Sequence, residues 1–259
     1  MSGVSSLKAP VADGPCLPAR ATVAVPVPAP AAAASLRGGP ALAGLVPFSS
    51  VDWPGQLAAV LFIAGCPWRC GYCHNAHLQR RHAAYAWPSV LDWLATRAGL
   101  LDGVVFSGGE PLSEARLPEL ARAVRALGFR VGLHTAGIYP RRLAALLPQL
   151  DWVGLDIKAD SAGHDALVGR PGGLARVQAS LALLLGAGLP FECRTTWDPA
   201  CLSEPRLLAL ARSLAAQGVR RYAVQACRTG TATVPGASLS APAREALASW
   251  FETFCYREG

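Results

Sequence analysis

Short apolar runs recur along most of the chain, and each is followed by a turn signal and then by a segment with helical spacing. From Leu45 onward six runs have the length of a strand, and they cover residues 58–63, 103–107, 131–135, 152–157, 191–196 and 222–226. Residues 1–40 show no such periodicity, because Ala, Pro and Val dominate them without order. The pattern therefore predicts six β-strands that alternate with helices.

Two segments between the strands carry clear helix signals. Residues 113–127 place leucines and a valine on one face, with Ser113 as the expected N-cap. Residues 174–187 repeat this pattern and end at Gly186 and Gly188. Strands that alternate with helices are parallel and joined by right-handed crossovers. Six such units are fewer than a closed barrel needs, so the pattern fits an open, partial (β/α)6 barrel of parallel strands or a doubly wound sheet.

Composition narrows the class of protein. Residues 1–40 read as a disordered Ala/Pro-rich tail, which leaves residues 41–259 as one α/β domain. No apolar run reaches the roughly 18 residues of a membrane span, and the N-terminus lacks the order of a secretory signal. We therefore expect a soluble, cytoplasmic protein that does not bind membranes. The net charge of +7 comes from dispersed arginines without a basic block, so we expect no nucleic-acid partner.

The chemically unusual residues all lie where a predicted strand ends. In chain order they are the cysteine-rich segment 64–75, Ser107 to Pro111, His134 to Gly137, Asp156 with Lys158, Arg194 to Thr196, and Gln225. The carboxyl ends of parallel strands lie on one face, where such folds place their functional sites. Six placements that agree predict one site on that face.

Three cysteines follow the first strand with the spacing Cys66-x3-Cys70-x2-Cys73. In a reducing compartment such a group binds metal more often than it forms disulfides. Three thiolates can hold a [4Fe–4S] cluster by three irons and leave the fourth iron open, whereas a structural zinc ion would need His74 or His77 as its fourth ligand. Glycines and charges on the same face favour the cluster. The other cysteines lack ligand spacing and are expected to be small buried hydrophobes: Cys16, Cys193, Cys201, Cys227 and Cys255.

Asp156 and Lys158 form a second candidate element. Because they are two residues apart on a strand, both side chains should point to one face while Ile157 points to the other. Lysine is rare in this chain, since only Lys8 and Lys158 among the 24 basic residues are lysine. A lysine at this strand end therefore indicates a specific role.

The segment Cys66–Asn75, followed after one helix by Ser107–Pro111, resembles the radical S-adenosylmethionine superfamily. The resemblance rests on the CxxxCxxC spacing, on the aromatic residue before the last cysteine and on the Gly-Gly-Glu-Pro sequence. Within the superfamily the chain most resembles the activating enzymes of glycyl-radical proteins, in particular those of anaerobic ribonucleoside-triphosphate reductases. This likeness runs from about Gly44 to the C-terminus.

The resemblance implies a role for each matching position. Cys66, Cys70 and Cys73 would bind three irons of a [4Fe–4S] cluster, and S-adenosylmethionine would chelate the fourth. The implied contacts to S-adenosylmethionine are Tyr72 at the adenine, Gly108 and Gly109 at the methionine ammonium with Glu110 in the same segment, Asp156 and Lys158 beside the molecule, and Arg194 at the methionine carboxylate.

The resemblance also implies a reaction. An electron from the reduced cluster would break a carbon–sulfur bond of S-adenosylmethionine, and the 5′-deoxyadenosyl radical would remove hydrogen from a glycine of a partner enzyme. An anaerobic ribonucleotide reductase is the favoured partner and a formate-lyase type enzyme the alternative, with flavodoxin or ferredoxin as the electron donor. The rivals are a small-molecule enzyme of the superfamily, such as a deazapurine synthase, and a non-catalytic zinc-binding adaptor.

Three segments refine this expectation. His134–Gly137 stands where some relatives carry Asp-Thr-Asn-Gly, which puts in doubt any cation bound by that aspartate, and Gln225–Cys227 stands where others place a histidine. Ser50–Gly55 resembles the Asp-x-Pro-Gly entry of activating enzymes and implies Asp52 at the mouth of the site. The interval between Cys73 and Gly108 holds no cysteine, so no insert with further clusters is expected there.

Overall fold

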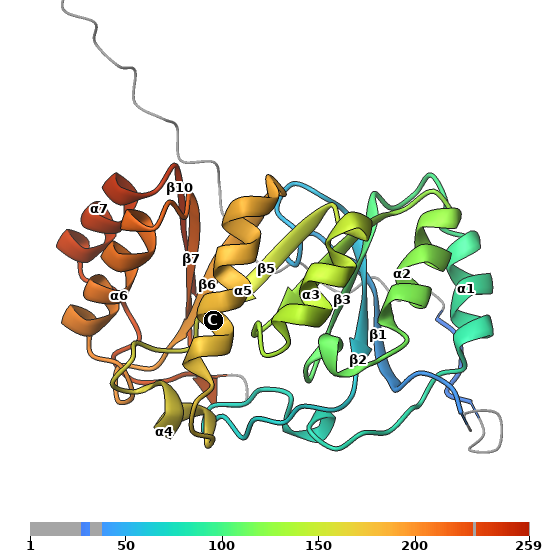
Figure 1. Cartoon of the computed structure of the whole chain (residues 1–259), viewed down its shortest axis with the longest axis horizontal. Coiled ribbons are helices and arrows are strands. Elements are labelled where there is room, and N and C mark those ends of the chain that lie inside the picture. The colour runs from blue at the N-terminus through green and yellow to red at the C-terminus, as the bar shows by residue number, and fades with distance from the viewer. Residues whose placement is uncertain (1–26, 32–37, 230–231, 259) are drawn as a thin grey trace, which may run out of the picture.

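The computed structural model describes residues 27–31, 38–229 and 232–258. One eight-stranded sheet runs through it, and Figure 1 shows the helices lying on one face of that sheet. In spatial order its strands are β1 (Leu42–Ser49), β2 (Ala58–Ile63), β3 (Gly103–Gly108), β4 (Arg130–Thr135), β5 (Trp152–Asp156), β6 (Phe191–Trp197), β7 (Arg221–Ala226) and β10 (Thr253–Arg257). A separate pair is formed by β8 (Arg228–Thr229) and β9 (Ala232–Thr233).

Helices connect the parallel strands. They are α1 (Trp87–Ala95), α2 (Leu117–Ala126), α3 (Pro140–Leu146), α4 (His164–Val168), α5 (Leu174–Ala187), α6 (Glu204–Ala216) and α7 (Ala241–Trp250), with the 3-10 turns η2 (Ala76–Leu78), η3 (Pro111–Ser113) and η4 (Leu147–Gln149). Strands β2 to β7 are neighbours in chain order and parallel. Because the order never reverses, every crossover lies on the same face, which rejects the doubly wound alternative. The predicted partial (β/α)6 barrel is confirmed, with β1 and β10 added at its edges.

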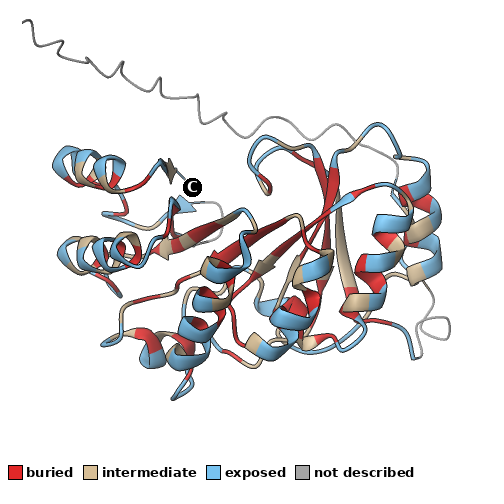
Figure 2. Ribbon diagram, turned by 45° about the horizontal axis from the view of Figure 1, so that its top comes forward, coloured by how far each residue is buried: buried red, intermediate tan, exposed pale blue. Residues whose placement is uncertain are grey.

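The two faces of the sheet have separate cores. The larger one lies between the sheet and the helices, and alternate residues such as Val104 and Phe106 of β3 point into it. The smaller one lies on the inner face and includes Val105 of β3 together with Trp152 of β5. Figure 2 shows the strands as the most buried part of the molecule. The inner face therefore carries both a small apolar core and, toward the strand ends, the polar candidate residues.

The connection between β1 and β2 fills one end of the inner face. Since β1 is antiparallel to β2, this connection lies at the amino end of β2, opposite the cysteine loop. Trp53 stacks on Trp152 with ring centroids 5.7 Å apart, and a Cβ at Gly103 or Gly132 would lie only 2.8 or 2.9 Å from its ring. The expectation that residues 50–55 line the mouth is therefore wrong, because the segment enters from the other end.

One predicted helix boundary is also corrected. Residues 111–113 form η3 and α2 begins only at Leu117, so Ser113 is not its N-cap. Instead, the hydroxyl of Ser113 donates to the carbonyl of Gly65 at 3.1 Å. Pro118 explains the late start, since proline is favoured in the first turn of a helix. By contrast, α5 covers the predicted range and ends at Gly188, whose φ of 65° suits glycine.

Most of the predicted tail, residues 1–40, lies outside the described residues. Two of its described positions contact the domain: the amide of Ala31 donates to the carbonyl of Ala84 at 2.8 Å, and Arg116 donates to the carbonyl of Gly38 at 3.2 Å. Within the described ranges, no helix combines the length and the apolar character that crossing a bilayer requires.

Candidate functional site

The cysteine loop lies over the carboxyl ends of the strands and is held there by backbone hydrogen bonds. The amide of Cys66 donates to Gln79 at 3.1 Å, and that of Arg69 donates to Val168 at the end of α4 at 2.9 Å. The amide of Cys73 closes a turn onto the carbonyl of Cys70 at 3.1 Å. Cys66, Cys70 and Cys73 are all half-buried free thiols. Backbone hydrogen bonds therefore fix the position of this loop, which carries all three cysteines.

Burial and nearby charges act in opposite directions on the pKa values of these thiols. Burial raises the pKa of Cys66 to about 11, and it also raises the pKa of Cys70. The positive charge of Lys158 opposes the shift at both thiols, whereas Asp156 adds to it at Cys70. Since metals bind the thiolate, Lys158 favours the form of the cysteines that binds metal.

Of the two histidines that the zinc alternative offers, His74 and His77, the first contacts the backbone of a distant segment. Nε2 of His74 lies 3.1 Å from the carbonyl oxygen of Arg228 and 3.4 Å from its amide nitrogen. Among the residues with described positions, no three His, Cys, Asp or Glu side chains gather around a single metal position.

Asp156 and Lys158 form the predicted pair beside the cysteines. Nζ of Lys158 lies 2.7 Å from Oδ2 of Asp156, and Ile157 is buried in the opposite core. The partner charge raises the pKa of the lysine and lowers that of the aspartate, despite burial, which acts in the opposite direction on each. Both groups are thus charged and are held at the end of β5.

Tyr72 lies against the same strand end. Its hydroxyl donates to the carbonyl of Lys158 at 3.4 Å, and burial raises its pKa. The structure therefore places Tyr72 beside Lys158, and a role for its ring at the adenine stays a prediction.

Gly108 and Gly109 are required by the protein's own backbone. A Cβ on Gly108, whose φ is 128°, would lie 2.3 Å from the carbonyl oxygen of Ile63, and one on Gly109 would lie 2.9 Å from that of Gly65. The end of β3 therefore packs directly on the start of the cysteine loop. Contact of this segment with S-adenosylmethionine stays a prediction.

Glu110 is fully buried and ties two strand ends together. Its carboxylate accepts from the amide of Leu112 at 3.1 Å, from the hydroxyl of Thr135 at 2.7 Å and from the amide of Ala136 at 2.9 Å. Burial raises its pKa to about 7, although these donors oppose the shift. The side chain of Glu110 therefore connects the segment that follows β3 to the end of β4.

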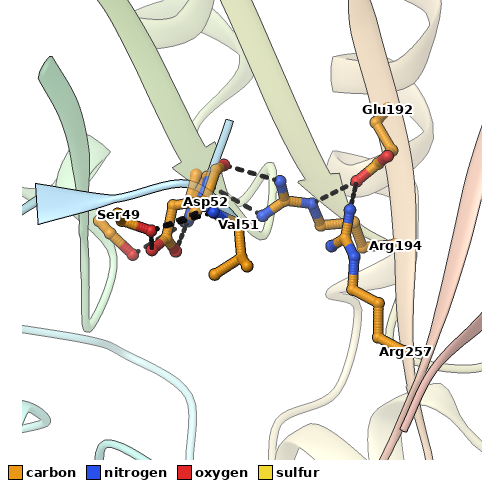
Figure 3. A network of polar contacts seen from close by, with 8 residues as sticks. Ser49, Val51, Asp52, Glu192, Arg194 and Arg257 are labelled. Atoms are coloured by element: carbon orange, nitrogen blue, oxygen red, sulfur yellow. Dashed lines mark hydrogen bonds and ion pairs between the residues drawn. The ribbon is translucent and has the colours of Figure 1, made fainter. Parts of the chain in front are cut away.

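Arg194 is the centre of a network inside the barrel (Figure 3). Its Nε donates to Glu192 at 2.8 Å, its Nη2 to the carbonyl of Asp52 at 3.0 Å, and its Nη1 lies 2.9 Å from Nε2 of His134. Its guanidinium also covers the Trp152 ring, 4.8 Å from the centroid. A role at the methionine carboxylate stays a prediction, because the protein itself already supplies partners for Arg194.

His134 is neutral in this network. Burial and the charge of Arg194 lower its pKa to about 4. Nε2 lies 2.7 Å from the carbonyl oxygen of Asp52 and 2.9 Å from Nη1 of Arg194, and Nδ1 lies 3.2 Å from Ser107 Oγ. The carbonyl can only accept and the guanidinium can only donate, so Nε2 of the neutral ring satisfies one of these two partners at a time. The sequence predicts His134 at the site face, since it ends a predicted strand, but it gives no role for Glu192. The alternation of Glu192 and Arg194 along β6 is the signal that could have revealed Glu192.

With this geometry in view, comparison with known proteins identifies the family. Residues 60–197 match the Radical SAM superfamily, and the chain belongs to it. A Methanocaldococcus jannaschii protein named as a glycyl-radical enzyme activating enzyme is 28% identical over 193 residues, which cover 71% of this chain and 78% of that protein. The PqqA peptide cyclase of Streptomyces rochei is 33% identical over 195 residues, covering 70% of this chain and 53% of the cyclase.

Solved structures agree on the fold. A radical SAM methyltransferase from Sphaerobacter thermophilus superposes with a TM-score of 0.60 at 14% identity, covering 80% of this chain and 67% of that protein. Streptococcus suis SuiB bound to S-adenosylmethionine superposes with a TM-score of 0.56 at 15% identity, covering 75% of this chain and 48% of SuiB. This chain thus spans about half of SuiB and of several peptide cyclases.

Membership of the superfamily defines the cofactors as a [4Fe–4S] cluster and S-adenosylmethionine. The donor set fits them, since three half-buried thiols lie on one loop beside a lysine. The chain is a radical SAM enzyme with distant homology to glycyl-radical activating enzymes and to peptide cyclases.

Proposed function

We propose that the protein activates a glycyl-radical enzyme, with an anaerobic ribonucleoside-triphosphate reductase as the partner. The observation that carries the proposal is the match to the Methanocaldococcus jannaschii activating enzyme across most of both chains.

Different residues of the protein have different roles in the proposed reaction. When bound, the reduced cluster and S-adenosylmethionine supply a carbon radical that removes a hydrogen atom from the target. Cys66, Cys70 and Cys73 would hold the cluster, and the Asp156–Lys158 pair presents fixed charges beside it. Trp53 closes the amino end of the inner face and excludes water there, since only 5% of its surface is exposed.

The direct test is anaerobic incubation of the protein with S-adenosylmethionine, a reductant and the ribonucleotide reductase from the same source. The expected result is an electron paramagnetic resonance doublet from a glycyl radical on the reductase. Absence of the doublet with this reductase and with a formate-lyase type enzyme, while S-adenosylmethionine is still cleaved, would contradict the proposal.

A second candidate is modification of a peptide. The identity of 33% to a PqqA peptide cyclase over 195 residues favours it. A covalent change in the mass of a peptide substrate, without a stable glycyl radical, would support this candidate instead.

A further inference from the structure

The carboxyl end of α4 binds the backbone of the cysteine loop. The carbonyl of Val168 accepts from the amide of Arg69 at 2.9 Å. The carbonyl of Leu167 accepts from the amide of Gly71 at 3.2 Å. Gly169 ends the helix with a φ of 65°, and a Cβ there would lie 3.3 Å from the carbonyl oxygen of Arg69. In Figure 1 the short α4 lies beside this loop, so helix and loop are in close backbone contact.

One pair of rings joins the same two elements. Trp68 lies in the middle of the Cys66–Cys70 interval, and only 2% of its surface is exposed. Its ring meets the buried His164 ring of α4 edge-on, with centroids 5.2 Å apart and planes inclined by 80°. A Cβ on Gly173 would lie 2.9 Å from Cε1 of His164 and 3.1 Å from Cζ2 of Trp68, so glycine leaves the space that both rings need. Edge-to-face contact is a favourable geometry for aromatic rings, and here it fixes the loop side chain against α4.

Hydrogen bonds set the orientation of the His164 ring. Its Nδ1 lies 3.2 Å from Oδ1 of Asp165, and because a carboxylate can only accept, Nδ1 carries the hydrogen. The other oxygen of Asp165 accepts from the amide of Gly172 at 2.8 Å. Nε2 of His164 is buried without a hydrogen-bond partner among the described residues, which is uncommon for a buried polar atom. Contact with Trp68 therefore accounts for the burial of this ring, whereas hydrogen bonding at Nε2 does not.

The segment that carries His164 is itself anchored beside the Asp156–Lys158 pair. Asp160 follows Lys158 by two residues, and both of its carboxylate oxygens accept from Arg206 of α6, at 2.8 and 2.5 Å. Its backbone carbonyl accepts from the amide of His164 at 2.9 Å. A continuous set of contacts thus runs from the end of β5 through His164 to the cysteine loop.

We propose that His164 is a positioning residue of the radical SAM site: its ring holds Trp68 and so fixes the cysteine loop relative to Lys158. The ring acts through Trp68, since the loop side chain that it contacts lies between the first two of the three cysteines. Loss of the ring would let the loop move while the strands beneath it stay folded. The inference rests on membership of the superfamily and on the expected cluster-binding role of the cysteines, and it does not depend on which protein receives the radical.

The test compares His164→Asn with His164→Phe. Asparagine keeps a donor near the position of Nδ1 but removes the ring, whereas phenylalanine keeps a ring that can meet Trp68 and removes the donor. Hydrogen–deuterium exchange of residues 66–75 is measured by mass spectrometry, in the reconstituted protein and in the protein without its cluster. Exchange in this loop should become at least about tenfold faster in His164→Asn and stay within about threefold in His164→Phe.

Spectroscopy and kinetics separate a positioning role from a purely structural one. Electron paramagnetic resonance of the reduced cluster is recorded with and without S-adenosylmethionine, and KM and kcat are measured for its cleavage with dithionite. In His164→Asn the spectrum with S-adenosylmethionine should change and the KM should rise by at least about fivefold, because small displacements in a site weaken its binding geometry. His164→Phe should resemble the unaltered protein in both measurements.

Two further variants keep the result interpretable. Leu247→Ala removes a buried side chain from α7, which packs on α6 and β10, and should lower the free energy of unfolding without altering loop exchange or the spectrum. Trp68→Leu removes the other ring, so adding His164→Asn to it should speed loop exchange little further, a comparison that holds even if phenylalanine packs poorly at position 164.

Four results would overturn the proposal. The first is loop exchange in His164→Asn that equals that of the unaltered protein, and the second is a Leu247→Ala protein with the same effects as His164→Asn. The third is a loop that exchanges faster in His164→Asn while the spectrum and the KM stay unchanged. The fourth is full additivity of Trp68→Leu and His164→Asn, which would show that the two rings do not act together.

Discussion

At the scale of single residues, the cysteines differ in their surroundings. Cys66, Cys70 and Cys73 are half-buried on one loop at the strand ends, and their role as cluster ligands stays a prediction from their spacing. The expectation that the other cysteines are small buried side chains holds for Cys193 and Cys227 and is wrong for Cys201, which is exposed near Asp198, and for Cys255, which is half-buried. Cys16 lies outside the described residues.

Replacing any one of Cys66, Cys70 or Cys73 with alanine should abolish the intact cluster and the cleavage of S-adenosylmethionine, because one iron would lose its only protein ligand. Iron and sulfide content after anaerobic reconstitution measures this. Cys201→Ala is the matched control and should keep the cluster. A Cys70→Ala protein with a full complement of iron would show that the assignment is wrong.

The raised pKa of Glu110 predicts a pH dependence of the free energy of unfolding. Burial raises its pKa from 4.5 to about 7, so between these values the folded protein binds its proton more tightly than the unfolded chain does. The free energy of unfolding should therefore fall as the pH rises from about 4.5 to about 7, by up to roughly 3 kcal/mol. Denaturant titrations across this range should show a flatter pH dependence for Glu110→Gln. If the free energies of unfolding of the unaltered protein and of Glu110→Gln change with pH in parallel, the Glu110 carboxyl is not the titrating group.

At the scale of elements, the strands divide into those that sequence could predict and those that it could not. The six parallel strands from β2 to β7 are mostly buried, and β2, β3 and β5 read as nearly continuous apolar runs. The edge strands β1 and β10 are half-exposed, and β1 is interrupted by Gly44 and Pro47. Their pairing depends on neighbours distant in sequence, so local pattern did not reveal them.

The β1–β2 connection depends on one aromatic side chain. Trp53→Ala would remove the stack on Trp152 and leave a cavity over Gly103 and Gly132. We expect a loss of about 3 kcal/mol in the free energy of unfolding, measured by denaturant titration. Leu100→Ala, at an exposed leucine, is the control and should change stability by less than about 0.5 kcal/mol. Equal effects of the two substitutions would contradict the packing role of Trp53.

The Ala/Pro-rich segment should be dispensable for the chemistry. A protein that begins at Ala41 loses the Ala31–Ala84 and Gly38–Arg116 contacts but keeps β1 whole. We expect it to retain its cluster and its rate of S-adenosylmethionine cleavage within about twofold, since no candidate site residue precedes Ala41. Loss of the cluster would instead make the segment part of the fold.

At the scale of the whole molecule, topology explains how much of the site was predictable. Parallel strands bring their carboxyl ends to one face, so the cysteine loop, the Gly-Gly-Glu-Pro segment and the Asp156–Lys158 pair could be placed together from sequence. The contacts of Arg194 with Asp52 and His134 could not, because both residues lie far from it along the chain. Those contacts depend on how the β1–β2 connection folds back into the barrel, which no local pattern encodes.

Asp52 lies at the end of the inner face opposite the cysteine loop, and its backbone carbonyl binds Arg194. Asp52→Ala preserves that contact while removing a carboxylate that is one-third exposed. Because a partner that enters over the cysteine loop would not reach this end, we expect glycyl-radical formation on the reductase and uncoupled S-adenosylmethionine cleavage both to stay within about twofold. Electron paramagnetic resonance and product analysis measure the two rates. A tenfold loss of radical formation alone would instead place the entering loop of the partner at this end of the barrel.

The carboxylate of Glu192 binds both Arg194 and Arg257, and Arg194 in turn holds the backbone of Asp52. This network therefore joins the start of the domain to its last strand. During synthesis on the ribosome the cysteine loop emerges early, whereas Arg257 emerges only after nearly all of the sheet. The nascent chain thus exposes its metal-binding thiols throughout translation, before the inner face can close around them. The network that completes the inner face can form only after β10 has been made and has paired with β7.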